Sequence, residues 1–168
     1  MHAMTKENLE AAFAGESQAH MKYLIFAGQA EKDGYPNVAR LFHANAYAEQ
    51  VHATSHFKVL KKLSTTENNL TAGIEGETFE IEEMYPAYIA VAELQEERGA
   101  VRSTKWAREA EKVHAEMYAD AKSSVADGKD VEVGKMHVCS VCGWTGEGDA
   151  PGNCPLCNAK KELFVLFG

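Results

Sequence analysis

Apolar residues recur at helical spacing through most of the chain, from about residue 5 to residue 126. This region is rich in Ala, Glu, Lys, Leu and Met, which favour helices, and it holds few residues that break them. Turn signals interrupt the pattern at residues 33–36, 63–69 and 98–99. The pattern therefore predicts four helices, over residues 5–32, 37–62, 69–97 and 100–126.

The four predicted helices are long enough to build a bundle, because each exceeds the average globular helix of about 11–12 residues. The first and third connections are short and predict two antiparallel hairpins. The middle connection, residues 63–69, carries the chain from one hairpin to the other. If it crosses the bundle, the topology is ferritin-like. We therefore predict an all-α four-helix ferritin-like bundle over residues 4–127.

Pro86 is a strong interruption inside the third predicted helix. Proline removes a helical hydrogen bond, so it either ends the helix or kinks it. Apolar and small residues continue from Ala87 to Leu94. This continuation favours a kink over an end.

The character of the sequence changes after residue 126, where a polar segment precedes a region of high Gly and Pro density. Residues 132–138 alternate imperfectly, as a short strand does, and residues 163–167 form an apolar strand pattern. We predict a linker at residues 128–134 and a small β-rich domain at residues 135–168. A domain of this size needs a metal to complete its core.

Charge and hydropathy narrow the classes of partner. The formal net charge is −8 and the isoelectric point is near 5.4, whereas nucleic-acid binders normally carry a basic face. Apolar runs are far shorter than the roughly 20 residues that span a bilayer. The N-terminus lacks the pattern of a signal peptide. We expect a cytoplasmic protein that binds neither nucleic acid nor membranes.

A repeated pentapeptide carries the strongest chemical signal. Residues 48–52 read Ala-Glu-Gln-Val-His, and in the last predicted helix residues 110–114 read Ala-Glu-Lys-Val-His. Within each copy Glu and His are three positions apart, so they share one helix face. Each copy also follows a helix with its own Glu candidates, Glu16 before the first copy and Glu80 and Glu83 before the second. The two hairpins therefore indicate an internal duplication.

These side chains match the ligand plan of a two-metal carboxylate bundle. One Glu-x-x-His is common on helix surfaces, but inward carboxylates are costly to bury unless they bind a cation. Carboxylate and imidazole together suit Fe, Mn or Zn. Glu49 and Glu111 are the expected bridging ligands, and His52 and His114 would each bind one metal. The remaining carboxylates are Glu16 and Glu80, as terminal ligands, and Glu83, one turn from Glu80.

Several neighbouring residues allow two interpretations. Tyr23 lies two turns after Glu16, and Tyr88 follows Glu83 by little more than one turn. Core packing is the default for both tyrosines, and hydrogen bonding to a metal ligand is the alternative. Surface or packing roles are expected for Glu82 and for the histidines outside the repeat, His20, His43 and His56.

All four cysteines lie near the C-terminal end of the chain, as two Cys-x-x-Cys pairs. The pairs are Cys139 with Cys142 and Cys154 with Cys157. Without a secretion signal, this spacing indicates a metal site and not disulfides. Four thiolates suit either zinc or a single iron. The pattern alone favours a structural zinc ribbon, whereas a redox bundle would need an iron that carries electrons.

Together these motifs resemble the rubrerythrin family, in which a ferritin-like di-iron bundle precedes a rubredoxin domain. The resemblance covers residues 5–168. It rests on Gly-Glu-Ser-Gln-Ala at 15–19, on both pentapeptides, on Gly-Glu-Thr-Phe-Glu at 76–80 with Glu-Met-Tyr-Pro at 83–86, and on both cysteine pairs. It implies two iron ions in the bundle and one iron on the four cysteines. It also implies a peroxidase that reduces hydrogen peroxide to water in oxidative-stress defence.

The resemblance further implies roles for single residues. Glu49 and Glu111 would bridge the irons, with Glu16, His52 and Glu83 on one iron and Glu80 and His114 on the other. His52 and Glu83 would exchange as that iron changes its oxidation state, and Tyr23 and Tyr88 would hydrogen-bond near the site. Asn158 stands where rubredoxins often have Gly, and Asn tolerates a left-handed backbone.

The implied partners follow from the same family. Electrons would come from a rubredoxin or an NAD(P)H-dependent rubredoxin reductase, through the cysteine-bound iron. The family is dimeric, the rubredoxin domain of one subunit commonly serves the bundle of the other, and some members exchange helices between subunits.

Two rival functions share part of the pattern. A ferroxidase or iron-storage bundle prefers dioxygen and needs no cysteine domain, and a non-catalytic metal-binding or electron-carrier protein would hold zinc in a colourless cysteine site.

Overall fold

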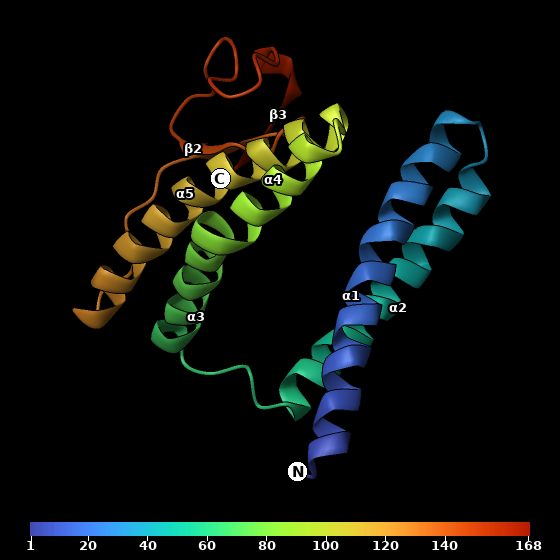
Figure 1. The fold of residues 1–168 in the computed structure, drawn as a ribbon, viewed down its shortest axis with the longest axis vertical. Coiled ribbons are helices and arrows are strands. Elements are labelled where there is room, and N and C mark those ends of the chain that lie inside the picture. The colour runs from blue at the N-terminus through green and yellow to red at the C-terminus, as the bar shows by residue number, and fades with distance from the viewer. The chain divides into compact units, whose positions relative to one another are not determined.

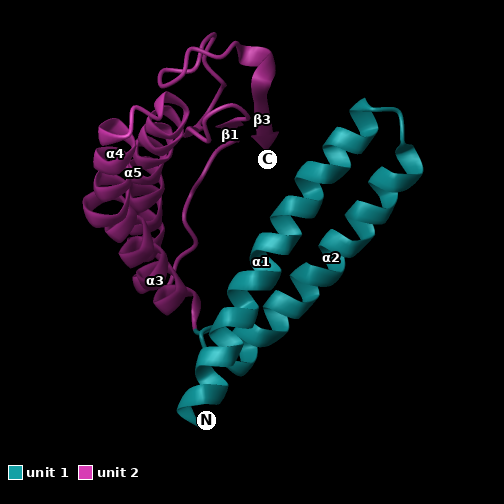
Figure 2. Cartoon of the chain, turned by 45° about the vertical axis from the view of Figure 1, so that its right-hand side comes forward, with its two compact units in different colours: residues 1–64 teal, residues 65–168 magenta.

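The computed structural model describes residues 1–168, which form two compact units, Met1–Ser64 and Thr65–Gly168 (Figure 2). The first unit is a pair of long helices (Figure 1). The second unit combines a helical run and a further long helix with a small sheet. The helical N-terminal region and the β-rich C-terminal region agree with the element classes that the sequence predicts. No helix is both long and apolar enough to cross a bilayer.

The first unit is an antiparallel hairpin of α1 (Ala3–Lys32) and α2 (Pro36–Val59). Gly34 makes the turn with a left-handed φ of 81°, and the N–H of Tyr35 donates to the carbonyl of Ala30. Proline suits the first position of α2, because that position needs no N–H donor. The hairpin thus begins and ends close to the predicted residues.

Small side chains form the most buried part of the contact between α1 and α2. Ala39, Ala46 and Ala53 are buried and recur at every seventh position, which places them on one stripe of α2. The buried residues of α1 are Ala27 and Ala30. Aromatic rings also meet between the helices, Phe13 with Phe57 and Phe26 with Phe42. Several large apolar side chains of the hairpin are nevertheless exposed, among them Ile25, Phe26, Leu41, Tyr47 and Val51.

The second unit begins with a continuous helical run from residue 66 to residue 94. It comprises α3 (Thr66–Phe79), a π-helical segment (Glu80–Met84, η1) and α4 (Tyr85–Leu94). The hydroxyl of Thr65 accepts from the N–H of Asn68, and this cap starts α3 slightly before the predicted position. After a short turn, α5 (Arg98–Ala126) packs along α3 and α4.

The π-helical segment explains how the helix passes Pro86 without ending. The N–H of Tyr85 donates to the carbonyl of Glu80, five positions back. In the same pattern the carbonyl of Ile81 would need the N–H of Pro86, which proline lacks. Nε of Arg108, on α5, donates to that carbonyl at 2.9 Å. The interruption expected at Pro86 is therefore a change of helical register, stabilised by a side chain from the next long helix.

A three-stranded antiparallel sheet follows the helices, in the order β2-β1-β3. The strands are β1 (Met136–Cys139), β2 (Thr145–Glu147) and β3 (Phe164–Phe167), and a short 3-10 turn, η2 (Lys161–Leu163), leads into β3. The small core of this module contains Cys139, Ala150, Cys154 and Phe164, with Trp144 packed against it. Neither helix nor strand forms between Ala126 and Met136, where the sequence predicts a linker. The exact domain boundaries stay a prediction.

Candidate metal centres

The first unit brings one Glu–His group together. Glu16 from α1 and Glu49 and His52 from α2 offer ligand atoms that all lie within 4.8 Å of one another. Nδ1 of His52 lies 2.9 Å from a carboxylate oxygen of Glu49, as expected for residues three apart on a helix. The side chain of His52 is 57% exposed. All three residues are those that the sequence predicts as ligands on this hairpin.

The second unit brings a matching group together from α3 and α5. Its members are Glu77, Glu111 and His114, again with ligand atoms within 4.8 Å of one another. Nδ1 of His114 lies 2.7 Å from Oε2 of Glu111 and 3.9 Å from Oε1 of Glu77. The His114 side chain is 28% exposed, about half the exposure of its counterpart in the first unit. This group is therefore the more enclosed of the two.

Glu77 is not among the ligands that the sequence analysis predicts, although the repeat contains a signal for it. The separation along the chain from Glu77 to Glu111 is almost equal to that from Glu16 to Glu49. Glu80 lies closer to Glu111 and fits the repeat less well. Glu77 and Glu16 also each follow a glycine directly. Glu77 is therefore the positional counterpart of Glu16.

Glu80 and Glu83 lie on the π-helical segment, beyond Glu77. Glu80 is half-buried and close enough to Glu77 that, after burial, the charge of Glu77 raises its pKa. Glu83 is exposed and lies outside the group of Glu77, Glu111 and His114. The ligand roles of Glu80 and Glu83, and the exchange of Glu83 with His52, stay predictions.

The second group concentrates negative charge in a partly buried place. Burial, followed by the charge of Glu111, raises the pKa of Glu77 above its ordinary value, while His114 acts in the opposite direction. Burial and the carboxylates Glu80, Glu111 and Glu77 also raise the pKa of Tyr85. A divalent cation would relieve this repulsion, because it favours the ionised form of every carboxylate around it.

Tyr85 is a second neighbour of this group that the sequence reasoning missed. Its ring meets that of Tyr88 edge to face, with centroids 6.4 Å apart, and Tyr88 is itself 54% exposed. Tyr23, on α1, packs against Phe26 and Phe42. Packing is thus the observed role of Tyr23, and the predicted hydrogen bonds from Tyr23 and Tyr88 to the metal site stay predictions.

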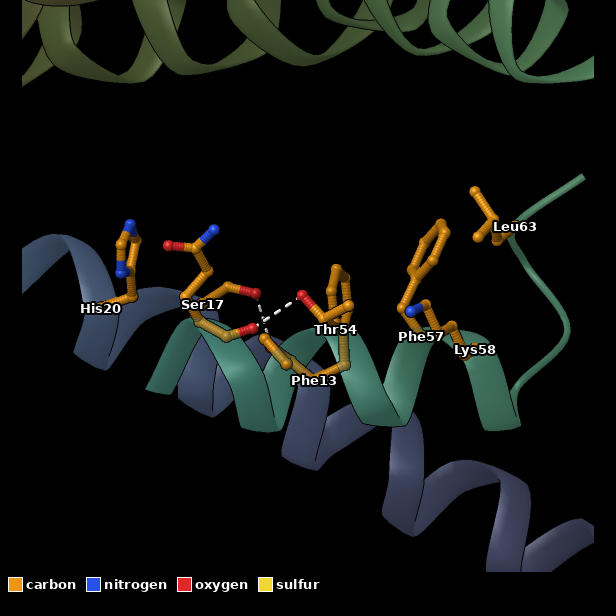
Figure 3. A pocket seen from close by; sticks show the side chains of 9 residues that line it. Phe13, Ser17, His20, Thr54, Phe57, Lys58 and Leu63 are labelled. Carbon is orange, nitrogen blue, oxygen red and sulfur yellow. Dashed lines mark hydrogen bonds between the residues drawn. The ribbon is translucent and has the colours of Figure 1, made fainter. Parts of the chain in front are cut away.

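Two of the remaining histidines have the packing or surface roles expected of them. Nδ1 of His20, on α1, lies 2.8 Å from the carbonyl of Ala46 on α2, so His20 joins the two helices. His43 is exposed and lies 3.5 Å from Glu31. His20 also lines a largely apolar cavity of about 390 Å³ on the hairpin, with Phe13, Ala53, Phe57 and Leu63 (Figure 3). That cavity contains no carboxylate.

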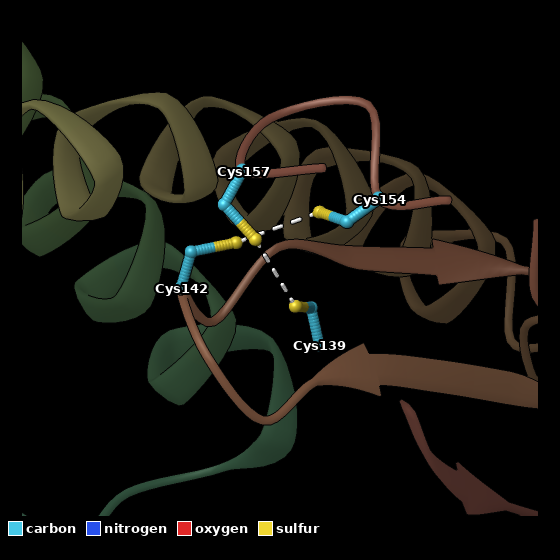
Figure 4. A group of neighbouring side chains, drawn as sticks. All are labelled: Cys139, Cys142, Cys154 and Cys157. Atoms are coloured by element: carbon cyan, nitrogen blue, oxygen red, sulfur yellow. Dashed lines mark hydrogen bonds between the residues drawn. The ribbon is translucent and has the colours of Figure 1, made fainter. Parts of the chain in front are cut away.

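The four cysteines converge in the small module (Figure 4). The sulfur of Cys139 lies 3.6 Å from that of Cys157, and the sulfur of Cys142 lies 3.6 Å from that of Cys154. With metal–sulfur bonds of about 2.3 Å, a regular tetrahedron has edges of about 3.8 Å. The observed spacing therefore fits one tetrahedral metal ion.

Two equivalent turns present these sulfur atoms. Gly143 has a φ of 80° and its N–H donates to the carbonyl of Cys139, and Asn158 has a φ of 62° and donates to the carbonyl of Cys154. Asn158 thus adopts the left-handed backbone that the sequence comparison with rubredoxins implies. Burial opposes ionisation of Cys139, but the N–H groups of Val141 and Cys142 lower its pKa to about 7. Burial raises the pKa of Cys142 and of Cys157.

The Glu–His groups also fit the ions expected of them. Each offers two carboxylates and one imidazole, and this oxygen and nitrogen set suits iron. In each group the ligand atoms lie within 4.8 Å of one another. This separation is close to the greatest distance between two ligand atoms of one ion whose bonds are about 2.0–2.2 Å long. Holding the partly buried carboxylates close together costs free energy unless a cation binds between them.

Comparison with known proteins agrees with this geometry. Residues 7–122 match the sequence model of rubrerythrin, and residues 137–165 match that of the rubrerythrin rubredoxin-like domain. The chain is 43% identical to rubrerythrin-2 of Clostridium acetobutylicum over 99% of this chain and 98% of that protein. It is 36% identical to nigerythrin of Nitratidesulfovibrio vulgaris over 97% of this chain and 86% of that one.

A solved structure of nigerythrin in its fully reduced, all-ferrous state is similar to this fold. The TM-score is 0.57 at 34% identity, over 97% of this chain and 86% of that one. The likeness confirms the fold class, a ferritin-like bundle with a small rubredoxin-like module. Rubrerythrins carry a di-iron centre and a rubredoxin-like iron, and both ligand types are present here. With two family domains matched in order along nearly the whole chain, this protein belongs to the rubrerythrin family.

Proposed function

We propose that this protein is a cytoplasmic peroxidase that reduces hydrogen peroxide to water. Each peroxide takes up two electrons and two protons, its O–O bond breaks, and two water molecules form. One observation carries the proposal: a single chain holds two Glu–His groups and a separate four-thiolate site. A storage bundle would not need the thiolate site, whereas a reductase needs a group that brings electrons in.

The Glu–His groups would hold the iron pair. Glu16, Glu49 and His52 are one half of the ligand set, and Glu111 and His114 with Glu77 are the other. Glu80 and Glu83, on the adjacent π-helical segment, extend the second half. When bound, the irons supply electrons to the substrate and act as Lewis acids on its oxygens. Solved structures of nigerythrin in reduced and mixed-valent states support a centre whose irons change oxidation state.

The protein side chains around the second half control protons and water. The hydroxyl of Tyr85 keeps its proton at neutral pH, because the pKa of an ordinary tyrosine near 10 already lies well above that pH and burial and the nearby carboxylates raise it further. It would therefore be available as a hydrogen-bond donor to an oxygen atom of the substrate. The half-buried position of Glu77 and Glu111 limits how much water reaches them. The limited access to the carboxylates favours a small oxidant such as hydrogen peroxide over a bulky substrate.

The cysteine module is proposed to carry electrons one at a time from an external donor. The donor would be a rubredoxin or an NAD(P)H-dependent rubredoxin reductase. One iron on four thiolates suits this role because it can change oxidation state within a fixed sulfur cage, whereas zinc cannot. The sulfur spacing of 3.6 Å is compatible with that cage.

We further propose that the protein works as a homodimer. The hairpin of α1 and α2 buries mainly alanine and leaves larger apolar side chains exposed, including Phe26 (45%), Leu41 (60%) and Val51 (50%). Exposed apolar surface of this kind marks an interaction site. A second copy of the chain is the proposed partner, and exchange of hairpins between copies is one way to cover this face.

The test uses iron-loaded protein that has been reduced anaerobically. Hydrogen peroxide or dioxygen is added in a rapid-mixing experiment, and the visible absorbance of the iron–thiolate site is followed. The proposal expects that peroxide reoxidises this site much faster than dioxygen does. Faster reoxidation by dioxygen would instead support a ferroxidase, and a colourless cysteine site in protein loaded with metal during growth would support a zinc ribbon.

A further inference from the structure

The helix around Pro86 has two possible hydrogen-bond registers. In the observed π register the N–H of Tyr85 donates to the carbonyl of Glu80, five positions back. In an uninterrupted α-helix the same N–H would donate to the carbonyl of Ile81, four positions back. The carbonyl of Glu82 would then face Pro86, which has no N–H. The two registers therefore leave different carbonyls without a backbone donor, that of Ile81 in the π register and that of Glu82 in the α register.

Arg108 supplies the missing donor in only one of these registers. Its Nε donates to the carbonyl of Ile81 at 2.9 Å, and both residues are partly buried. A partly buried carbonyl is costly to leave without a donor, so this bond stabilises the π register. The α register would leave only the carbonyl of Glu82 open, and water can reach that carbonyl because Glu82 is exposed. The balance between the registers therefore depends on Arg108.

The register determines whether Tyr85 faces the carboxylates of the second Glu–His group. Tyr85 is eight positions after Glu77, so a regular α-helix would place the two side chains about 80° apart around its axis. The π turn contains one extra residue, which sets every later residue back by about 100°. Tyr85 then lies about 20° from Glu77, on the same face. In agreement with this placement, burial and then the charge of Glu80 raise the pKa of Tyr85.

Tyr88 has the opposite relation to the same face. It is eleven positions after Glu77, which is about three α-helical turns, so a regular α-helix would place it beside the carboxylates. The extra residue of the π turn rotates it away, and Tyr88 is 54% exposed in the structure. Regular helical periodicity therefore favours Tyr88 at the site, whereas the π register places Tyr85 there.

We propose that Arg108 is a positioning residue that holds the π register and thereby selects Tyr85, and not Tyr88, as the tyrosine beside the second Glu–His group. In this register α4 packs against α5 and buries Ile89 and Ala92, so helix packing acts in the same direction as Arg108. Arg108 is the one of these contributions that can be removed by changing a single hydrogen-bond donor.

The test compares two replacements of Arg108 that differ in this donor. Glutamine carries its amide nitrogen as many bonds from the backbone as Nε of arginine, so Arg108→Gln keeps a donor for Ile81. Arg108→Met keeps the length of the side chain without any donor. Both variants lose the positive charge. Arg102→Met is the matched control, because Arg102 lies on the same helix and stacks on Trp106.

The measurement is fluorine NMR of protein labelled with fluorotyrosine, in which Tyr85→Phe and Tyr88→Phe assign the two signals. Ferrous, iron-loaded protein is compared with metal-free protein. The iron broadens the signal of the nearer tyrosine more, because paramagnetic broadening falls steeply with distance. This readout reports the position of each ring and does not depend on turnover.

In the unaltered protein, in Arg108→Gln and in Arg102→Met, we expect the signal of Tyr85 to be broadened more than that of Tyr88. In Arg108→Met the equilibrium should move toward the α register by about 5- to 150-fold, the effect of leaving one carbonyl without its donor. Broadening should then shift from Tyr85 to Tyr88. Unchanged line widths in Arg108→Met would overturn the inference.

A double variant keeps the test conclusive if Arg108→Met alone does not fold. Pro86→Ala restores the N–H that the carbonyl of Glu82 lacks in the α register. The variant Pro86→Ala/Arg108→Met can therefore form a complete α-helix, and we expect Tyr88 to be its more broadened tyrosine. Greater broadening of Tyr85 in this folded variant would overturn the inference.

Deletion of Glu82 separates positioning from stability. Without this exposed residue, Tyr85 stands seven positions after Glu77 and faces the carboxylates in a regular α-helix. In this background Arg108→Met should still lower the free energy of unfolding but should leave the line widths of both tyrosines unchanged. A shift of broadening as large as in the full-length chain would show that Arg108 does not act through the register.

This inference rests on the proposed function, because Tyr85 is there the donor to the substrate, but the two can fail separately. If the line widths respond to Arg108→Met while peroxide leaves the bundle irons of the unaltered protein reduced, the peroxidase function is wrong and the role of Arg108 stands. If peroxide oxidises the irons and the line widths do not respond, only the role of Arg108 is wrong.

Discussion

The two helical regions carry the same ligand pattern but hold it differently. In the hairpin of α1 and α2, Glu16, Glu49 and His52 lie on two uninterrupted helices, and His52 is 57% exposed. In the second unit the matching group is half-buried, and it lies next to a π-helical segment and a contact to the cysteine module. The internal duplication that the sequence indicates would account for the shared pattern. We therefore expect the second group to hold its metal more firmly than the first.

Replacing the two histidines separately should give the largest difference between the halves. We expect His114→Ala to weaken iron binding by more than about 100-fold and His52→Ala by about tenfold, because His114 is held from both sides whereas His52 is exposed. Iron titration of metal-free protein, with colorimetric counting of bound iron, measures both effects. Equal losses in the two variants would remove the proposed difference between the halves.

The π-helical segment offers a second way to test the comparison, through stability. Arg108→Ala leaves the carbonyl of Ile81 without a donor, so the free energy of unfolding should fall by about 1–3 kcal/mol. Arg40→Ala is the control in the first unit, where Arg40 bonds only to Asn37 at the surface. Denaturant unfolding followed by circular dichroism measures both variants. A loss at Arg108 no larger than at Arg40 would mean that the carbonyl is satisfied in another way.

The charge of the second group should appear in the pH dependence of the metal-free protein. Burial and Glu111 raise the pKa of Glu77, so the folded state binds its proton up to a higher pH than the unfolded chain does. The contribution of Glu77 to the free energy of unfolding is therefore fully present below the pKa of the unfolded chain and is lost as pH rises through the raised value.

The variant Glu77→Gln should flatten this fall, and Glu82→Gln, an exposed carboxylate on the π-helical segment, should leave it unchanged. Chemical unfolding between about pH 4 and pH 8 covers the window in which an ordinary glutamate, with a pKa near 4.3, and a raised one differ. Added iron should also flatten the fall in the unaltered protein. The same pH dependence of stability in Glu77→Gln and in the unaltered protein would contradict the direction of the shift.

Ion pairs on the surface should contribute least to any difference in stability between the two helical regions. Lys105 on α5 bonds to Glu93 on α4 at 2.7 Å, but both side chains are about half exposed. We expect Lys105→Ala to change the free energy of unfolding by less than about 0.5 kcal/mol. Thermal unfolding at low and high salt measures this effect. A larger, salt-sensitive loss would assign part of the rigidity of the second unit to charge.

The sequence was sufficient for the features that depend on local pattern. Helical periodicity predicts the helices, and the cysteine spacing predicts the convergence of the four thiols. The repeated pentapeptide predicts two clusters that contain Glu16, Glu49 and His52 in one and Glu111 and His114 in the other, and their roles as metal ligands stay predictions. Glu77 is harder to recognise because Glu80 and Glu83 share one helix face with the expected ligand spacing, although the separation of Glu77 from Glu111 fits the repeat better.

Features that depend on distant partners could not be predicted. The register change at Glu80–Met84 requires Arg108 to satisfy the carbonyl that Pro86 leaves open. The bond from His114 to Thr145 joins a helix to a strand that lies well beyond it in the sequence. Neither pair has a local signal, because each contact is created by tertiary packing.

The central claim is that the two Glu–His groups are halves of one di-iron centre. The most direct measurement is Mössbauer and electron paramagnetic resonance spectroscopy of the oxidised, iron-loaded protein. The account expects the two bundle irons to be magnetically coupled through shared carboxylates, so that only the cysteine-bound iron gives a strong ferric resonance. Two further ferric signals, each from an isolated bundle iron, would show separate sites and contradict the claim.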